Sequence, residues 1–133
     1  MRKSVTKIRV RYAETDQMGV VYHGNYIPYL EEARTEWLRN TGLSYKWMEE
    51  NGVFLPVIQV HIDYKLPAHY DDVLSITTKL KKIPTFRIEF DYEIHNQNDA
   101  LLATASVTLV FVDKQSGKLV KAPQYLLEKL EGN

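Results

Sequence analysis

The hydrophobic period of the sequence changes after the long predicted helix, and this change constrains the fold more than any other feature. Apolar side chains recur at helical spacing from residue 26 to residue 38, whereas apolar and polar residues alternate from residue 57 to residue 111. A period near 3.6 predicts an amphipathic helix, and a period of two predicts half-buried strands. We therefore expect one long helix followed by a series of strands.

Turn-forming residues divide the alternating region into separate strands. Prolines and the stretches HNQND and KQSGK mark these turns. Short turns favour antiparallel neighbours, and one amphipathic helix can cover one face of such a sheet. The predicted fold class is α+β, with a curved antiparallel sheet of about five strands around one long central helix. The expected strands cover residues 6–12, 58–66, 74–80, 86–94 and 103–111, and short helices are expected over 44–51 and 123–130.

The long helix has recognisable ends and faces. Asn25 is suited to the N-cap position, and Gly42 is suited to end the helix. Trp37 is expected in the core. Glu31 and Arg34 are expected to form an exposed ion pair at i,i+3 spacing, so we interpret the glutamates of this helix as surface charges.

Charge and composition exclude several classes of function. Lys+Arg and Asp+Glu both number 17, which argues against nucleic acid as a partner because phosphate binding needs a basic excess. The absence of cysteine excludes a thiol nucleophile, a disulfide framework and a cysteine zinc site. No apolar run reaches the roughly 18 residues that a membrane span needs, and no secretory signal is present. We therefore expect a cytoplasmic protein with no membrane span.

The stretch DQMGVVYHGNY, which starts at Asp16, directly precedes the long helix. A helix N-terminus offers unpaired N–H groups and a positive dipole end, which can stabilise an oxyanion on a substrate carbonyl. Gly19 and Gly24 permit tight turns, and Asp16 could act on the same carbonyl as nucleophile or as general base. An aspartate in such a loop is also typical of a turn or cap. The residues alone leave both interpretations open.

A family resemblance extends this interpretation. The segment RYAETDQMGVVYHGNYIPYLEEARTEWLR resembles the opening of the hotdog-fold acyl-CoA thioesterases of the 4-hydroxybenzoyl-CoA thioesterase family. It is most similar to the branch associated with the Tol–Pal envelope system. The segment DYKLPAHYDDVLSI is also similar to a strand, loop and strand of that family. The resemblance covers most of the chain and implies a single hotdog thioesterase domain over residues 1–133.

The resemblance implies hydrolysis of an acyl-CoA to free CoA and a carboxylic acid, with no cofactor and no metal. Asp16 would be the catalytic carboxylate, and His23 would contribute its backbone N–H to the thioester carbonyl as well as its imidazole. The family's active sites lie between subunits, so a homodimer or homotetramer is implied. The remaining expected substrate-binding residues are Tyr22, Gly24, Asn25 and Tyr26.

Two other functions compete with this one. A hotdog dehydratase or hydratase acting on acyl thioesters would carry an H-x-x-x-P-G motif, which this chain lacks. A non-catalytic acyl-thioester binding or scaffold protein of the envelope machinery would have no need for Asp16.

Other polar residues support weaker hypotheses. His61 and Asp63 share one strand face and could form part of a metal site, but two ligands without a third are more typical of a solvated face. Five basic residues could contact the phosphates of CoA, although exposed lysines on strands are commonly solubilising. These residues are Lys65, Lys79, Lys81, Lys82 and Arg87.

Overall fold

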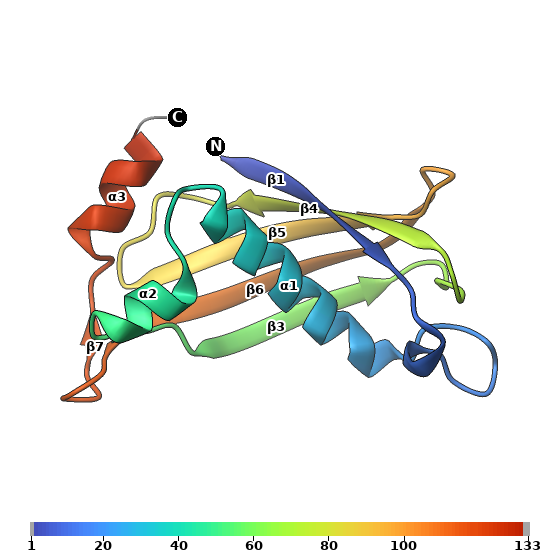
Figure 1. Ribbon diagram of the computed structural model, residues 1–133, viewed down its shortest axis with the longest axis horizontal. Coiled ribbons are helices and arrows are strands. Elements are labelled where there is room, and N and C mark those ends of the chain that lie inside the picture. Colours follow the sequence, from blue (N-terminus) through green and yellow to red (C-terminus); the bar gives the residue numbers. More distant parts are fainter. Residues whose placement is uncertain (1, 132–133) are drawn as a thin grey trace.

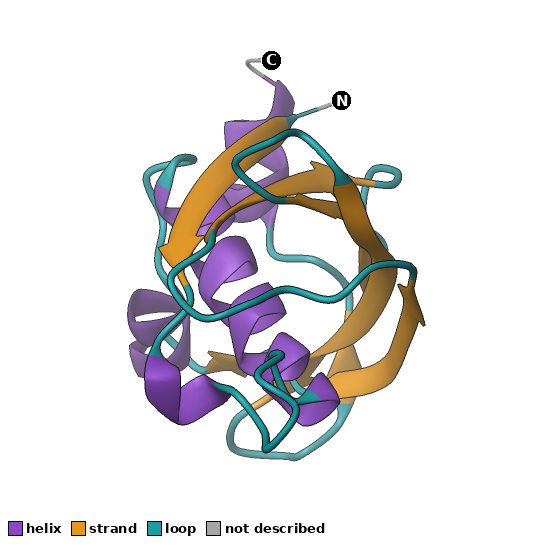
Figure 2. Cartoon of the chain, turned by 90° about the vertical axis from the view of Figure 1, so that its right-hand side faces the viewer, coloured by secondary structure: helices purple, strands orange, loops and turns teal. Residues whose placement is uncertain are grey.

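One antiparallel sheet, curved around a long helix, forms the framework of the computed structural model, which describes residues 2–131 (Figures 1 and 2). The described strands are β1 (Lys3–Arg9), β2 (Val53–Phe54), β3 (Val57–Tyr64), β4 (Val73–Leu80), β5 (Arg87–His95), β6 (Leu101–Asp113) and β7 (Leu119–Val120). The helices are α1 (Tyr26–Arg39), α2 (Tyr45–Glu50) and α3 (Gln124–Glu131), with 3-10 turns η1 (Tyr12–Glu14) and η2 (His23–Asn25). The α+β class and the antiparallel sheet are as predicted.

The five long strands lie in the order β1-β4-β5-β6-β3, so β3 and β1 are the outer strands of this part of the sheet. β2 and β7 both pair with the C-terminal part of β6. Neither was predicted, because two residues are too few to show a period of two. The first strand ends at Arg9 and not at residue 12, because η1 follows it.

Helix α1 lies against the concave face of the sheet, as the end-on view of Figure 2 shows. Trp37 is fully buried, as predicted, and its ring meets that of Phe90 on β5 edge to face at 4.8 Å between centroids. Burial of such side chains is the main favourable contribution to folding. The apolar residues that α1 buries are Tyr26, Tyr29, Leu30, Ala33, Trp37 and Leu38.

The prediction of an exposed Glu31–Arg34 ion pair is wrong. Arg34 is only 7% exposed, and no carboxylate lies within ion-pair distance of it among the described residues. The reason is helical geometry: Arg34 lies four residues after Leu30 and four before Leu38, so it shares their buried row. Because arginine is charged, the burial of this position was not recognised from the sequence.

The buried guanidinium of Arg34 lies beside the hydroxyls of Tyr45 and Tyr92. Burial raises the pKa of Tyr45 to about 12, although the nearby guanidinium acts in the opposite direction. Burial likewise raises the pKa of Tyr92. Two neutral hydroxyl groups therefore lie next to this buried cation, where a carboxylate would be the common partner, and the Tyr92 hydroxyl has no hydrogen-bond partner among the described residues.

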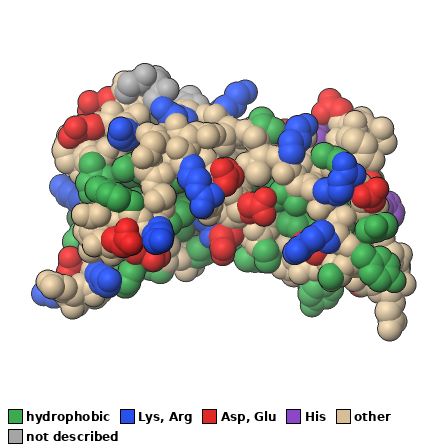
Figure 3. Space-filling model, viewed as in Figure 1, with side chains coloured by type: hydrophobic (Ala, Val, Ile, Leu, Met, Phe, Trp, Pro, Cys, Tyr) green, Lys and Arg blue, Asp and Glu red, His purple; other side chains and the backbone are tan. Residues whose placement is uncertain are grey.

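The face of the molecule that carries α1 shows lysine and arginine side chains interspersed with aspartate and glutamate (Figure 3). This mixture agrees with the equal numbers of the two kinds of charge in the sequence. None of the helices within residues 2–131 has the length and apolar character needed to cross a bilayer.

The two tryptophans of the chain allow a matched test of the core. Trp37→Ala should lower the free energy of unfolding by about 3–5 kcal/mol, because it leaves a large cavity between α1 and β5. Trp47→Ala should cost about 1 kcal/mol, since Trp47 is 42% exposed. Urea unfolding at one fixed protein concentration measures both. Equal losses for the two variants would contradict the assignment of Trp37 to the core.

Candidate active site

A cavity of about 360 Å³ lies where the start of α1 meets the end of β3, at the right-hand end of the molecule in Figure 1. The loop before α1 and the helix itself provide Asp16, Val20, Val21, His23 and Tyr26. The end of β3 and the residues after it provide Tyr64, Lys65, Leu66 and Pro67. The structure thus brings three of the predicted site residues, Asp16, His23 and Tyr26, to one cavity.

Asp16 closes its own turn. Its Oδ1 accepts hydrogen bonds from the N–H groups of Met18 at 2.9 Å and Val20 at 3.5 Å. Gly19 has a φ of +80°, a conformation that favours glycine, and its N–H donates to the Asp16 carbonyl. The second carboxylate oxygen, Oδ2, has no partner among residues 2–131, and the side chain is exposed. Asp16 is therefore a turn residue that keeps one oxygen free.

The turn η2 presents unpaired donors ahead of α1. The Asn25 N–H donates to the Tyr22 carbonyl, and the Tyr26 N–H donates to the His23 carbonyl. The N–H groups of His23 and Gly24 have no acceptor in the described part of the chain. Free N–H groups at the positive end of a helix can bind a negatively charged oxygen. This geometry provides the donors that an oxyanion site needs.

Glu14 links the loop to helix α1, a role that was not predicted from the sequence. Its carbonyl accepts hydrogen bonds from the Tyr22 N–H at 3.0 Å and from the Asn25 side-chain amide at 2.8 Å. Its carboxylate accepts from the Tyr29 hydroxyl and the Arg11 N–H, both at 2.8 Å, and pairs with the Arg11 guanidinium. Asn25 thus occupies the N-cap position without capping the helix through its side chain, contrary to expectation.

The bonds to Glu14 also set its ionisation. Burial alone raises the pKa of the Glu14 carboxyl, but the hydrogen bonds from the Arg11 N–H, the Tyr29 hydroxyl and the Arg11 guanidinium outweigh that effect. The result is a pKa below the ordinary value of 4.5. Conversely, burial and the bond to Glu14 raise the pKa of Tyr29. Glu14 is therefore an anion near neutral pH, and Tyr29 remains its hydroxyl donor.

Tyr22 and Gly24, two predicted substrate-binding residues, pack against each other. A Cβ atom on Gly24 would lie 2.7 Å from the Tyr22 ring, so the glycine permits a close approach of this ring. The Tyr22 side chain is otherwise exposed, with its ring 4.4 Å from that of His23. Substrate binding by Tyr22, Gly24, Asn25 and Tyr26 stays a prediction.

Tyr64, the residue that β3 itself contributes to the cavity, was not predicted as a site residue. The Tyr64 hydroxyl donates to the His23 carbonyl at 2.9 Å, across 41 positions of sequence. No local pattern indicates such a contact, because it depends on how the curved sheet brings the end of β3 to the start of α1. Of the five basic residues considered for CoA, only Lys65 lines this cavity, and Lys82 pairs with Glu89 at 3.3 Å.

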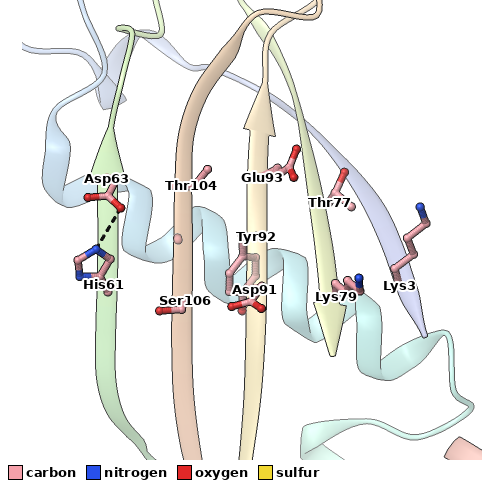
Figure 4. Close-up of a pocket in the computed structure, with 11 residues that line it drawn as sticks. Lys3, His61, Asp63, Thr77, Lys79, Asp91, Tyr92, Glu93, Thr104 and Ser106 are labelled. Atoms are coloured by element: carbon pink, nitrogen blue, oxygen red, sulfur yellow. Dashed lines mark hydrogen bonds and ion pairs between the residues drawn. The ribbon is translucent and has the colours of Figure 1, made fainter. Parts of the chain in front are cut away.

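A larger groove of about 640 Å³ lies on the sheet face turned away from α1 (Figure 4). Here His61 and Asp63 form an exposed pair, with Nε2 and Oδ2 3.1 Å apart. Within residues 2–131, no group of three or more potential ligands could hold a metal ion. The solvated interpretation of His61 and Asp63 is the one that this geometry favours.

The sequence profile of the thioesterase-like superfamily matches residues 10–130. This chain belongs to the thioesterase-like superfamily. The match spans the loop, the helix and the sheet that build the cavity, and it confirms the predicted family of thioester hydrolases.

Individual relatives of this thioesterase-like chain support the same family assignment. The protein YneP of Bacillus subtilis (strain 168) is 39% identical over 121 residues, which cover 91% of this chain and 88% of YneP. The acyl-CoA thioester hydrolase YbgC of Escherichia coli O157:H7 is 33% identical over 124 residues, covering 93% and 92%. The crystal structure of DHNA-CoA thioesterase from Staphylococcus aureus superposes with a TM-score of 0.91 at 35% identity, covering 98% of this chain and 88% of that one. The predicted hotdog fold is confirmed.

The low pKa of Glu14 predicts a pH-dependent contribution to the stability of this thioesterase-like fold. Its stabilising effect should be complete above about pH 4.5 and should disappear as the pH falls through the lower, folded-state pKa. The difference in free energy of unfolding between the wild type and Glu14→Gln should therefore be largest near neutral pH and shrink in acid. Glu32→Gln, at an exposed position of α1, is the control. A difference that does not vary with pH would show that the negative charge of Glu14 is not what stabilises the contacts between the loop and α1.

Proposed function

We propose that this chain hydrolyses acyl-CoA thioesters to free CoA and a carboxylic acid. The observation that supports the proposal most directly is the joint placement of Asp16 and His23 on one cavity. Within residues 2–131, the Asp16 Oδ2 and the N–H groups of His23 and Gly24 have no partners. Membership of the thioesterase-like superfamily and the activity named for YbgC point in the same direction.

In this proposal the thioester carbonyl oxygen lies against the free N–H groups of His23 and Gly24. These donors stabilise the negative charge that develops on the oxygen when the carbonyl carbon is attacked. Asp16 either attacks the carbon itself or removes a proton from an attacking water. The C–S bond then breaks, the thiol of CoA leaves with a proton, and one water is consumed overall. All of these steps use groups of the chain and water.

We further propose that two copies pair to complete each site. β3 is an outer strand bonded on one side to β6, so its other edge offers free backbone groups to a second strand. Exposed apolar residues lie along it and just after it: Val57, Ile58, Tyr64 and Leu66. Pairing there would cover the cavity and withdraw Asp16 from water. The sheet face opposite α1 would be available for association of two such dimers into a homotetramer.

The proposed substrate also suggests contacts and a location. Lys65 lies on the cavity wall and is the basic residue best placed to approach a CoA phosphate near the site. Acyl-CoA is a substrate of the cell interior, so the proposed activity fits a cytoplasmic enzyme.

Two substitutions of Asp16 test its proposed catalytic role, because one of them keeps the oxygen that closes the turn and the other removes both oxygens. Asp16→Asn retains an oxygen that can accept from Met18 but loses the negative charge, so CoA release should fall about 100-fold or more while the melting temperature changes little. Asp16→Ala should lose both activity and stability. The assay measures CoA release from short-chain, long-chain and aromatic acyl-CoAs.

Asp91→Asn is the matched control, because Asp91 lies on β5 at the opposite sheet face, away from the β3 edge, and should not affect CoA release. Binding of acyl-CoA by the wild type without release from any substrate would favour the acyl-thioester binding protein instead. Unchanged release by Asp16→Asn would remove Asp16 from the mechanism.

The pairing of two copies has its own test. Sedimentation of the wild type should give at least twice the 15.5 kDa mass of one chain. Ile58→Lys places a charge at the proposed interface, so it should shift the protein towards the monomer and lower CoA release with it. Ile83→Lys, at a position that is also 51% exposed but lies outside β3, should leave the mass unchanged. A monomeric wild type that still releases CoA would contradict the shared site.

A further inference from the structure

The His23 carbonyl receives two hydrogen bonds from different parts of the fold. The Tyr26 N–H donates to it within the turn, and the Tyr64 hydroxyl donates to it from β3 at 2.9 Å. A carbonyl oxygen has two lone pairs, so both are in use. The bond from Tyr64 connects the sheet directly to the turn that carries the free donors.

A carbonyl that is fixed in this way also fixes nearby N–H groups. The peptide between His23 and Gly24 is planar and trans, so the Gly24 N–H points opposite to the His23 carbonyl. In a helical turn the other N–H groups, including that of His23, also point away from the carbonyls. Hydrogen bonding at the oxygen further polarises the peptide and strengthens its N–H as a donor.

We propose that Tyr64 is a positioning residue that, through the His23 carbonyl, fixes the direction of the free N–H groups of His23 and Gly24. The inference rests on the proposed thioesterase function and adds a residue to it. Tyr64 need not touch the reacting atoms for this role. It acts on the oxyanion donors from the strand that also forms the open edge of the sheet.

The hydroxyl and the ring of Tyr64 make different contacts. The ring packs edge to face against Tyr26 at 5.1 Å and against His23 at 6.3 Å between centroids. Phenylalanine would keep these contacts and remove only the hydroxyl. Burial raises the pKa of Tyr64, so the hydroxyl keeps its proton and remains a donor across the neutral pH range. Tyr64→Phe is therefore a selective variant.

The first measurement is independent of activity. His23–Gly24 is the only His-Gly pair in the sequence, so labelling histidine carbonyls with ¹³C and glycine nitrogens with ¹⁵N yields a single correlated NMR signal. Tyr64→Phe should move the His23 carbonyl and Gly24 amide shifts. Tyr70→Phe should not, since Tyr70 packs on Tyr12 through its ring and its hydroxyl has no hydrogen bond among the described residues. An unmoved signal in Tyr64→Phe would overturn the inference.

The second measurement is kinetic. Tyr64→Phe should lower kcat about tenfold, less than the loss of a whole oxyanion donor, with KM within about twofold of the wild type. The melting temperature should remain close to that of Tyr70→Phe. A merely structural role would lower stability and raise KM together, and that result would also overturn the inference.

The two proposals fail in different ways. A moved NMR signal with unchanged kcat would overturn the positioning role and leave the thioesterase proposal intact. A wild-type protein that releases CoA from no acyl-CoA would overturn the proposed function itself, and the positioning role with it.

Discussion

The apolar stripe of α1 is the constraint on which the rest of the structure depends. A 14-residue helix that buries a tryptophan, two tyrosines and two leucines needs apolar cover along most of its length. A sheet provides this cover when it curves around the helix, and the end-on view shows such curvature (Figure 2). The same curvature brings the end of β3 to the start of α1, far apart in sequence. The position of the cavity thus follows from the packing of the core.

The loop before α1 uses two of its carboxylates to hold its own shape, and it leaves other polar groups without protein partners among the described residues. Glu14 bonds to the loop and the helix, and Asp16 closes a turn with one oxygen. Among the groups that have no partner within residues 2–131 are one Asp16 carboxylate oxygen and the N–H groups of His23 and Gly24. Asp16 and His23 are exposed in a single chain, so water can solvate these groups until a substrate replaces it. An acceptor and donors left free around one cavity are the groups that a carbonyl substrate requires.

The long periodic elements could be predicted from the sequence because their residues repeat a pattern over many positions. Helix α1 and the five long strands follow from that pattern, whereas β2 and β7 are too short to show it. Asp16 and His23 could be proposed as site residues from their place before a helix and from the family resemblance, and the structure brings both to one cavity. Arg34 was assigned to the wrong face because its charge outweighed its helical position. The hydrogen bond from the Tyr64 hydroxyl to the His23 carbonyl could not be predicted, since it is a tertiary contact that no local pattern encodes.

The open edge of β3 links the proposed pairing of two copies to the proposed reaction. Asp16 is exposed in a single chain, and an exposed carboxylate and exposed N–H groups are solvated by water that competes with a substrate. The strand whose edge is free to pair also carries Tyr64, which holds the His23 carbonyl. A second copy paired at β3 would therefore exclude water from the cavity and restrain the strand that orients the donors. Both effects act at the start of α1. Pairing at this edge would therefore make the N–H groups of His23 and Gly24 stronger hydrogen-bond donors to the oxyanion of the proposed reaction.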